Sequence, residues 1–268
     1  NLDFYINENE DAENVLDNLI KAFSIQKANE KIYVIIDEYD HFANELLGFN
    51  TDQFKSLVSK NGKVRKWYEV LKEGTETVID RIFITGVAPI TLDSLTSGFN
   101  IGSDITRDEE FDEMLGFTEQ ELIKLMDEQN ISKEKQLELL PIMKENYEGY
   151  KFSVHGKEKI YNSNMCLYFL KDYVRLGRIP ENLVDVNIAS DYSKIGKMLD
   201  LCKGEKREEI IEKTVSGEGI LSEITQKFNP AKEFTDTDLV SMLYYLGYLT
   251  IEGIEVGFPK LKVPNKVM

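Results

Sequence analysis

Two adjacent carboxylates, Asp37 and Glu38, directly follow an unbroken apolar run, Ile32 to Ile36. A run this rich in β-branched residues is typical of a strand that is buried on both faces of a parallel sheet. Ligands of such sheets bind beyond the C-terminal ends of the strands, so both acids are expected at the binding edge. An acid in that place can hold Mg²⁺ beside phosphates, and a second can polarise an attacking water molecule as a general base. We therefore predict a Mg²⁺ site at Asp37 and a catalytic base at Glu38.

Thr85 ends the next predicted strand, Ile82 to Ile84, and is followed by Gly86. In P-loop ATPases an acid-terminated strand forms the Walker B motif, and AAA-type members place a residue that senses the γ-phosphate at the neighbouring strand end. Both features have a simpler explanation, because many buried strands end in polar residues only to return the chain to solvent. The spacing alone leaves the two interpretations open.

The sequence contains no Walker A loop of the pattern GxxxxGK[ST], which cradles phosphates with backbone N–H groups and a lysine. Its nearest imitation, Gly149 to Gly156-Lys157-Glu158, has the wrong spacing and an acid where a hydroxyl is needed. The only histidines, His41 and His155, have no neighbouring Cys, Ser or second His with which to form a catalytic pair. We interpret both histidines as surface or structural residues.

Helical and strand patterns alternate over the first ~80 residues, which favours a parallel α/β sheet because parallel neighbours need crossover connections. We expect one helix from about 10 to 24 and a second that closes near Gly74. A capping box at Thr118 to Glu121 predicts the start of a helical subdomain, in which Pro141 is expected to interrupt a helix. A helix ended by Gly247 and two β-prone segments then predict the tail of a winged-helix unit.

The predicted fold class is α/β, with a partial P-loop, AAA-like parallel sheet core, a mostly helical lid and a winged-helix-like C-terminal unit. The predicted domains are residues 1–112 for the core, 113–200 for the lid and 201–268 for the winged-helix-like unit.

The composition indicates a soluble globular chain, with 42% hydrophobic and 30% charged residues. Its formal net charge of -16 disfavours direct nucleic-acid binding, which needs clustered Lys and Arg. The two cysteines, Cys166 and Cys202, lie far apart and are expected to be reduced core thiols. No apolar run of ~18 residues and no signal-peptide pattern occurs, so we expect a cytoplasmic location without membrane partners.

Six short motifs follow one another along the chain: Asp37-Glu38-Tyr39-Asp40, Phe83-Ile84-Thr85-Gly86-Val87-Ala88-Pro89-Ile90-Thr91, Leu95-Thr96-Ser97-Gly98-Phe99-Asn100, Leu115-Gly116-Phe117-Thr118-Glu119, Tyr147-Glu148-Gly149-Tyr150-Lys151-Phe152 and Ile160-Tyr161-Asn162. In the residues and order of these motifs the chain resembles the bacterial AAA-ATPase-like family, whose members often carry a C-terminal PD-(D/E)XK nuclease-like domain.

The resemblance implies Walker B roles for Asp37 and Glu38 and a sensor role for Thr85, with ATP and Mg²⁺ as cofactors. Asp40 also matches, and we expect it among the cofactor-binding residues without a defined mechanism. In the family the phosphate loop lies upstream of the segment that matches Asn1, and the nuclease-like domain lies downstream of the segment that matches Met268. We therefore expect ATP hydrolysis from the complete protein and not from this chain alone.

Two functional hypotheses remain open. The first is an ATP-driven switch that couples its nucleotide state to a downstream effector. The alternative is a catalytically degenerate module that binds a protein partner or a second copy of itself, since the strong negative charge argues against DNA.

Overall fold

The computed structural model describes residues 10–27, 29–40, 62–87, 89, 99, 101–185, 206–226, 228 and 234–268. His41, Cys202 and most of the motif from 95 to 100 lie outside these residues. The chain divides into two compact units, residues 1–103 with 226–233 and residues 104–225 with 234–268. The three predicted domain boundaries remain a prediction.

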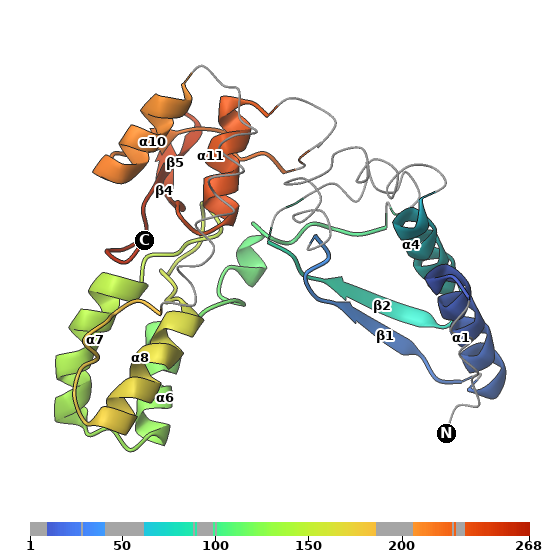
Figure 1. The fold of residues 1–268 in the computed structure, drawn as a ribbon, viewed down its shortest axis with the longest axis horizontal. Helices are drawn as coiled ribbons and strands as arrows, with labels where there is room; N and C mark the ends of the chain where they lie inside the picture. The colour runs from blue at the N-terminus through green and yellow to red at the C-terminus, as the bar shows by residue number, and fades with distance from the viewer. Residues whose placement is uncertain are drawn as a thin grey trace. The chain divides into compact units, whose positions relative to one another are not determined.

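Unit 1 contains two parallel strands, as the alternation of helix and strand patterns predicted. Strands β1 (Ile32–Ile36) and β2 (Ile79–Ile84) pair in register, with Ile35 opposite Phe83 and Ile36 opposite Ile84. Figure 1 shows the two strands side by side, with both C-terminal ends at the same edge. The acids after β1 and the threonine after β2 are therefore brought to one edge of the sheet.

Helices α1 (Ala12–Gln26) and α4 (Lys63–Gly74) cover one face of this sheet. Their buried residues, led by the fully buried Leu71, share a core with alternate β1 residues. The expectation that β1 is buried on both faces is wrong, because Tyr33 and Ile35 are 67% and 76% exposed. The physical reason is that α1 and α4 pack on a single face, and no other described element covers the opposite one.

Unit 2 begins with a helical part that the capping box predicted correctly. The Thr118 hydroxyl accepts from the Glu121 backbone N–H, and the Glu121 carboxylate accepts from the Thr118 N–H at 2.9 Å. The hydrogen bonds that the Glu121 carboxylate accepts from the backbone N–H and the hydroxyl of Thr118 lower the pKa of Glu121. The core contains Cys166, as predicted; its thiol is free and buried, and desolvation raises its pKa to about 12. The helices are α6 (Glu119–Glu128), α7 (Lys133–Tyr147) and α8 (Ser163–Leu176), as Figure 1 shows.

Pro141 does not interrupt its helix, contrary to the sequence expectation. It lies inside α7, which continues to Tyr147. A proline removes one backbone hydrogen bond and crowds the carbonyl four residues earlier. The helix tolerates this defect because Pro141 faces solvent, whereas Leu139, Met143 and Tyr147 are buried in the helical core and stabilise the turns on both sides.

The C-terminal part of unit 2 is a helix followed by an antiparallel hairpin, as predicted. The hairpin strands continue a small sheet of order β3-β5-β4. The tyrosines of the last helix pack in the core of this part: the Tyr244 hydroxyl donates to Phe152 O at 3.0 Å and the Tyr245 hydroxyl to Thr225 O at 3.1 Å. The winged-helix assignment itself remains a prediction. The elements are α10 (Arg207–Ser216), β3 (Ile220–Leu221), α11 (Asp236–Tyr245), β4 (Thr250–Glu255) and β5 (Phe258–Lys262) (Figure 1).

The segment after α7 joins the two parts of unit 2. Gly149 has φ +124°, and a Cβ at this position would lie 2.1 Å from the carbonyl oxygen of Pro264. Further along, the buried Asp112 carboxylate accepts from the backbone N–H groups of Phe152 and Ser153. The aromatic motif from 147 to 152 is thus a structural junction, and His155 beside it is exposed, as expected.

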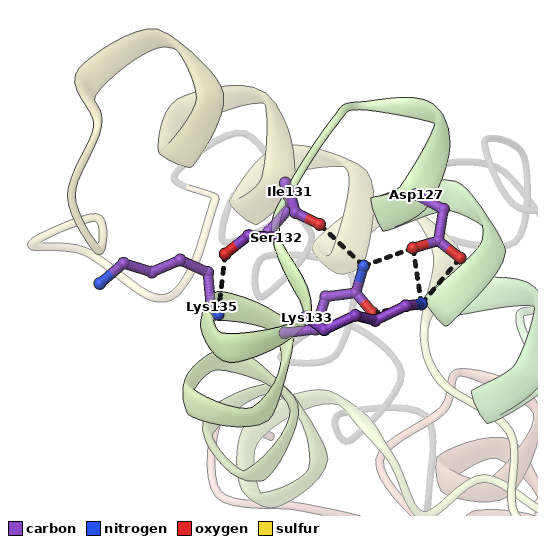
Figure 2. A network of polar contacts seen from close by, with 6 residues as sticks. Asp127, Ile131, Ser132, Lys133 and Lys135 are labelled. Atoms are coloured by element: carbon purple, nitrogen blue, oxygen red, sulfur yellow. Dashed lines mark hydrogen bonds and ion pairs between the residues drawn. The ribbon is translucent and has the colours of Figure 1, made fainter.

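A polar network closes the turn between α6 and α7, and Figure 2 shows Asp127 and Lys133 pointing toward one another. Lys133 Nζ donates to both Asp127 carboxylate oxygens, at 2.7 and 2.9 Å. The buried Gln136 amide donates to Asp127 Oδ1 at 2.6 Å and to Ile131 O at 2.9 Å. Hydrogen bonds from Lys133 and Gln136 lower the pKa of Asp127.

Replacing Gln136 by alanine should destabilise unit 2 by about 1–3 kcal/mol, because the buried carbonyl of Ile131 loses its side-chain donor. Chemical denaturation followed by far-UV circular dichroism measures this change. Lys133→Ala is the matched control in the same network, and it should change the midpoint little because its side chain is 67% exposed. Equal effects of the two variants would contradict the importance of the buried amide.

Candidate functional site

The site lies where β1 and β2 end. Their hydrogen-bonded pairing continues past the strands, since Thr85 N–H donates to Ile36 O at 2.8 Å and Tyr39 N–H donates to Thr85 O at 2.9 Å. These backbone bonds hold the segment from Asp37 to Asp40 against the segment from Thr85 to Val87. Backbone hydrogen bonds thereby hold together the two segments that carry the candidate side chains.

Asp37 and Thr85 are in direct contact. The Thr85 hydroxyl donates a short hydrogen bond to Asp37 Oδ1, and the Glu38 backbone N–H donates to the same oxygen at 3.0 Å. Asp37 is exposed, and its Oδ2 accepts no hydrogen bond from any described residue. One carboxylate oxygen is therefore oriented by the protein, and the other is open to a ligand.

Glu38 has a backbone conformation that non-glycine residues rarely adopt, with φ +52°. Strained backbone of this kind costs about 1–3 kcal/mol and is concentrated at functional sites. The Glu38 side chain is exposed beside the ordered Asp37 carboxylate. Two acids thus lie at the open sheet edge, one held by hydrogen bonds to the protein and one projecting from a strained position.

Asp40 differs from the other two acids because it is only 1% exposed. Both its carboxylate oxygens accept from the Val87 backbone N–H, each at 3.1 Å. The pKa of Tyr68 in α4 is raised to about 12, mainly by burial and secondly by the negative charge of the nearby Asp40. Asp40 therefore faces the protein interior.

The structure shows two contacts among the residues that the sequence singled out: Asp37 contacts Thr85, and Asp40 contacts the backbone of Val87. Their roles in metal binding, cofactor binding and catalysis remain predictions. Sequence reasoning missed Gly86, where a Cβ would lie 2.4 Å from the Tyr39 ring and 2.7 Å from Asp40 Oδ1. The signal for it was a glycine directly after the polar strand end.

The oxygens at this edge fit Mg²⁺, which is commonly held by one or two carboxylates together with waters and substrate phosphates. Asp37 offers a carboxylate and Thr85 a hydroxyl, both at strand ends. Within the described ranges no three His, Cys, Asp or Glu side chains cluster as a metal site. The residues present fit a cation that shares its coordination with a nucleotide.

An acid-terminated parallel strand beside a threonine-terminated one is the arrangement expected of an AAA-type ATPase. Residues 2–96 match the family model of the AAA-ATPase-like proteins, described as a predicted AAA-ATPase. This match confirms the AAA-ATPase-like family for the segment that carries the site. No curated protein and no solved structure matches the chain. Among the described residues, no helix has the length and apolar character needed to cross a membrane.

Proposed function

We propose that this protein is an ATP-binding and ATP-hydrolysing molecular switch of the AAA type, with its hydrolysis site at the ends of β1 and β2. The observation that carries the proposal is the contact between the Thr85 hydroxyl and Asp37, next to the exposed Glu38. A strand that ended in acids only to reach solvent would not require its carboxylate to be held by the neighbouring strand end. The match of residues 2–96 to AAA-ATPase-like proteins supports the same function.

Each residue has a role that its position allows. Asp37 uses the oxygen left open by Thr85 and the Glu38 N–H to bind Mg²⁺, directly or through water. Bound Mg²⁺ supplies neutralisation of charge on the β- and γ-phosphates. Glu38 accepts a proton from the attacking water. Thr85 senses the γ-phosphate through its hydroxyl, which also donates a hydrogen bond to Asp37.

The phosphate-binding loop belongs, on this proposal, to a segment upstream of the chain, as the family resemblance implies. ATP is strongly anionic, and a chain of net charge -16 needs both a local phosphate loop and Mg²⁺ to hold it. Hydrolysis then moves the proposed lid, residues 113–200, and the proposed winged-helix-like unit, residues 201–268, relative to an effector. The complete protein, meaning this chain with that upstream loop, is the proper object of every activity test.

Asp37→Asn in the complete protein should raise the Mg²⁺ concentration needed for half-maximal ATP hydrolysis about tenfold or more. The substitution keeps an oxygen that accepts from Thr85 and removes the charge that binds the cation. Phosphate release measured over a Mg²⁺ titration gives the result. Asp80→Asn is the matched control, because Asp80 is an exposed acid of β2 and should leave the titration unchanged.

An unchanged Mg²⁺ requirement in Asp37→Asn would contradict the metal-binding role. If the folded complete protein neither bound nor hydrolysed ATP, the alternative of a degenerate interaction module would replace the proposal. A mass measurement would then be the discriminating experiment, because a ligand-independent oligomer or a stable protein complex is what that alternative requires.

A further inference from the structure

We propose that Asp40 is a positioning residue, which holds the segment after β2 against the segment after β1 so that Thr85 reaches Asp37. The inference rests on the proposed function for its link to hydrolysis. The claim that Asp40 holds the two segments together does not depend on the proposed function, because it rests on the contacts of Asp40. The sequence identified Asp40 only as part of a motif, and this inference gives Asp40 a mechanism.

The contacts of Asp40 point inward. Its side chain is buried, and its two oxygens share the Val87 backbone N–H at 3.1 Å each. A buried carboxylate is costly unless it is hydrogen-bonded, so this bond between the two segments is strongly favoured over their separation. Val87 lies only two residues beyond Thr85, and fixing its backbone restricts where the Thr85 hydroxyl can lie.

Gly86 shows how closely the two segments approach. A Cβ there would lie 2.4 Å from two ring atoms of Tyr39 and 2.7 Å from Asp40 Oδ1, distances that real Cβ atoms do not adopt. A side chain at this position would therefore displace the Tyr39 ring or the Asp40 carboxylate. Tyr39, which contributes this contact, also donates its backbone N–H to Thr85 O at 2.9 Å. Tyr39 and Asp40 thus both contact the segment from Thr85 to Val87, which contains Gly86.

The position of Thr85 has a consequence for Asp37. Asp37 Oδ1 accepts from both Thr85 and the Glu38 N–H, and these two donors set the orientation of the carboxylate. A loss of the Asp40 bond would free Val87 and leave Thr85 held only by its two backbone bonds, to Ile36 O and from the Tyr39 N–H, so its hydroxyl would orient Asp37 less firmly. A displacement of about 1 Å in a reacting constellation can cost ~10²-fold in rate, so an effect through two intermediate residues can be large.

Direct contact of Asp40 with nucleotide is the competing role, and it makes a different prediction about charge. A positioning carboxylate acts by accepting a hydrogen bond, which asparagine can also do through its side-chain oxygen. A carboxylate that binds a cation or orients a nucleotide by its charge is not replaced by asparagine. Comparing Asp40→Asn with Asp40→Ala therefore separates the two roles.

The experiment measures kcat and KM for ATP, and backbone hydrogen exchange, for the complete protein and its variants. Asp40→Ala should lower kcat about 10- to 100-fold with KM within about threefold of wild type. It should also speed exchange at the Val87 and Tyr39 amides. Asp40→Asn should restore most of both properties. Asp80→Ala, a change of an exposed acid on the same sheet, is the control and should change neither.

Two results would overturn the proposal. One is a raised KM in Asp40→Asn equal to that in Asp40→Ala, which would assign Asp40 to nucleotide binding by charge. The other is unchanged exchange at Val87 and Tyr39 in Asp40→Ala. If the wild type lacked turnover, the proposed function would fail, while the exchange comparison would still decide whether Asp40 holds the segment.

Gly86→Ala provides an independent variant in case Asp40→Ala does not fold. It keeps the Asp40 charge, but its new methyl group displaces the Tyr39 ring or the Asp40 carboxylate from the segment after β2. The same loss of kcat and the same faster exchange at Val87 are expected. Wild-type kcat and exchange in Gly86→Ala would contradict the proposed close approach of the two segments.

Discussion

Glu38→Gln in the complete protein should lower kcat for ATP hydrolysis about 10²- to 10⁴-fold, which is the usual contribution of a positioned general base. ATP affinity should stay within about threefold of wild type, because glutamine keeps the size of the side chain and loses only its ability to accept a proton. The exposed position of Glu38 beside the ordered Asp37 carboxylate is the structural reason. Steady-state phosphate release and equilibrium binding of ATP measure the two quantities.

Glu30→Gln is the matched control for this prediction. Glu30 lies before the N-terminal end of β1, whereas the proposed site follows its C-terminal end; it pairs with Lys27 at 2.8 Å and its side chain is 60% exposed. It should leave kcat unchanged. If Glu38→Gln retained wild-type turnover, Glu38 would not be the base. A loss of ATP affinity that explained the whole effect would instead make Glu38 a binding residue.

Phe169→Ala should destabilise the helical part of unit 2 by about 3–5 kcal/mol, because truncating a buried phenylalanine removes apolar contacts and leaves a cavity. Phe169 is fully buried in the core of α6, α7 and α8. Its ring meets Tyr147 edge-on with centroids 5.8 Å apart and stacks with Tyr173 at 6.5 Å.

Urea denaturation followed by far-UV circular dichroism tests this prediction. Leu167→Ala is the control on the same helix, since Leu167 is 46% exposed and its loss should cost within about 0.5 kcal/mol. Trp67, the only tryptophan, lies in unit 1, and its fluorescence follows that unit separately. Equal midpoints for Phe169→Ala and Leu167→Ala would contradict the assignment of Phe169 to the core.

Features that depend on local chemistry were predictable from the sequence. The capping box at Thr118 requires only a hydroxyl and a carboxylate three residues apart, and both its hydrogen bonds form. The parallel pairing of β1 and β2 followed from the alternation of helix and strand patterns. The acids at the end of β1 were visible because the apolar run stops abruptly at Asp37.

Features that depend on tertiary packing were not predictable. The apolar run Ile32 to Ile36 does not reveal that only one face of β1 is covered by described helices. Pro141 signalled a break, yet buried neighbours keep α7 intact. Asp40 looked like another site acid, and only its burial and its bond to Val87 show that it faces inward. Asp37 and Thr85 are 48 positions apart in the chain, so their contact depends on how the two strands are placed relative to one another.

The most direct test of the central claim is a structure of the complete Glu38→Gln protein bound to Mg·ATP. The account predicts Mg²⁺ at the open oxygen of Asp37, directly or through one water, with the γ-phosphate facing the ends of β1 and β2 and Thr85 within hydrogen-bonding reach of it. Nucleotide bound elsewhere, with no metal near Asp37, would contradict the assignment of this sheet edge as the hydrolysis site.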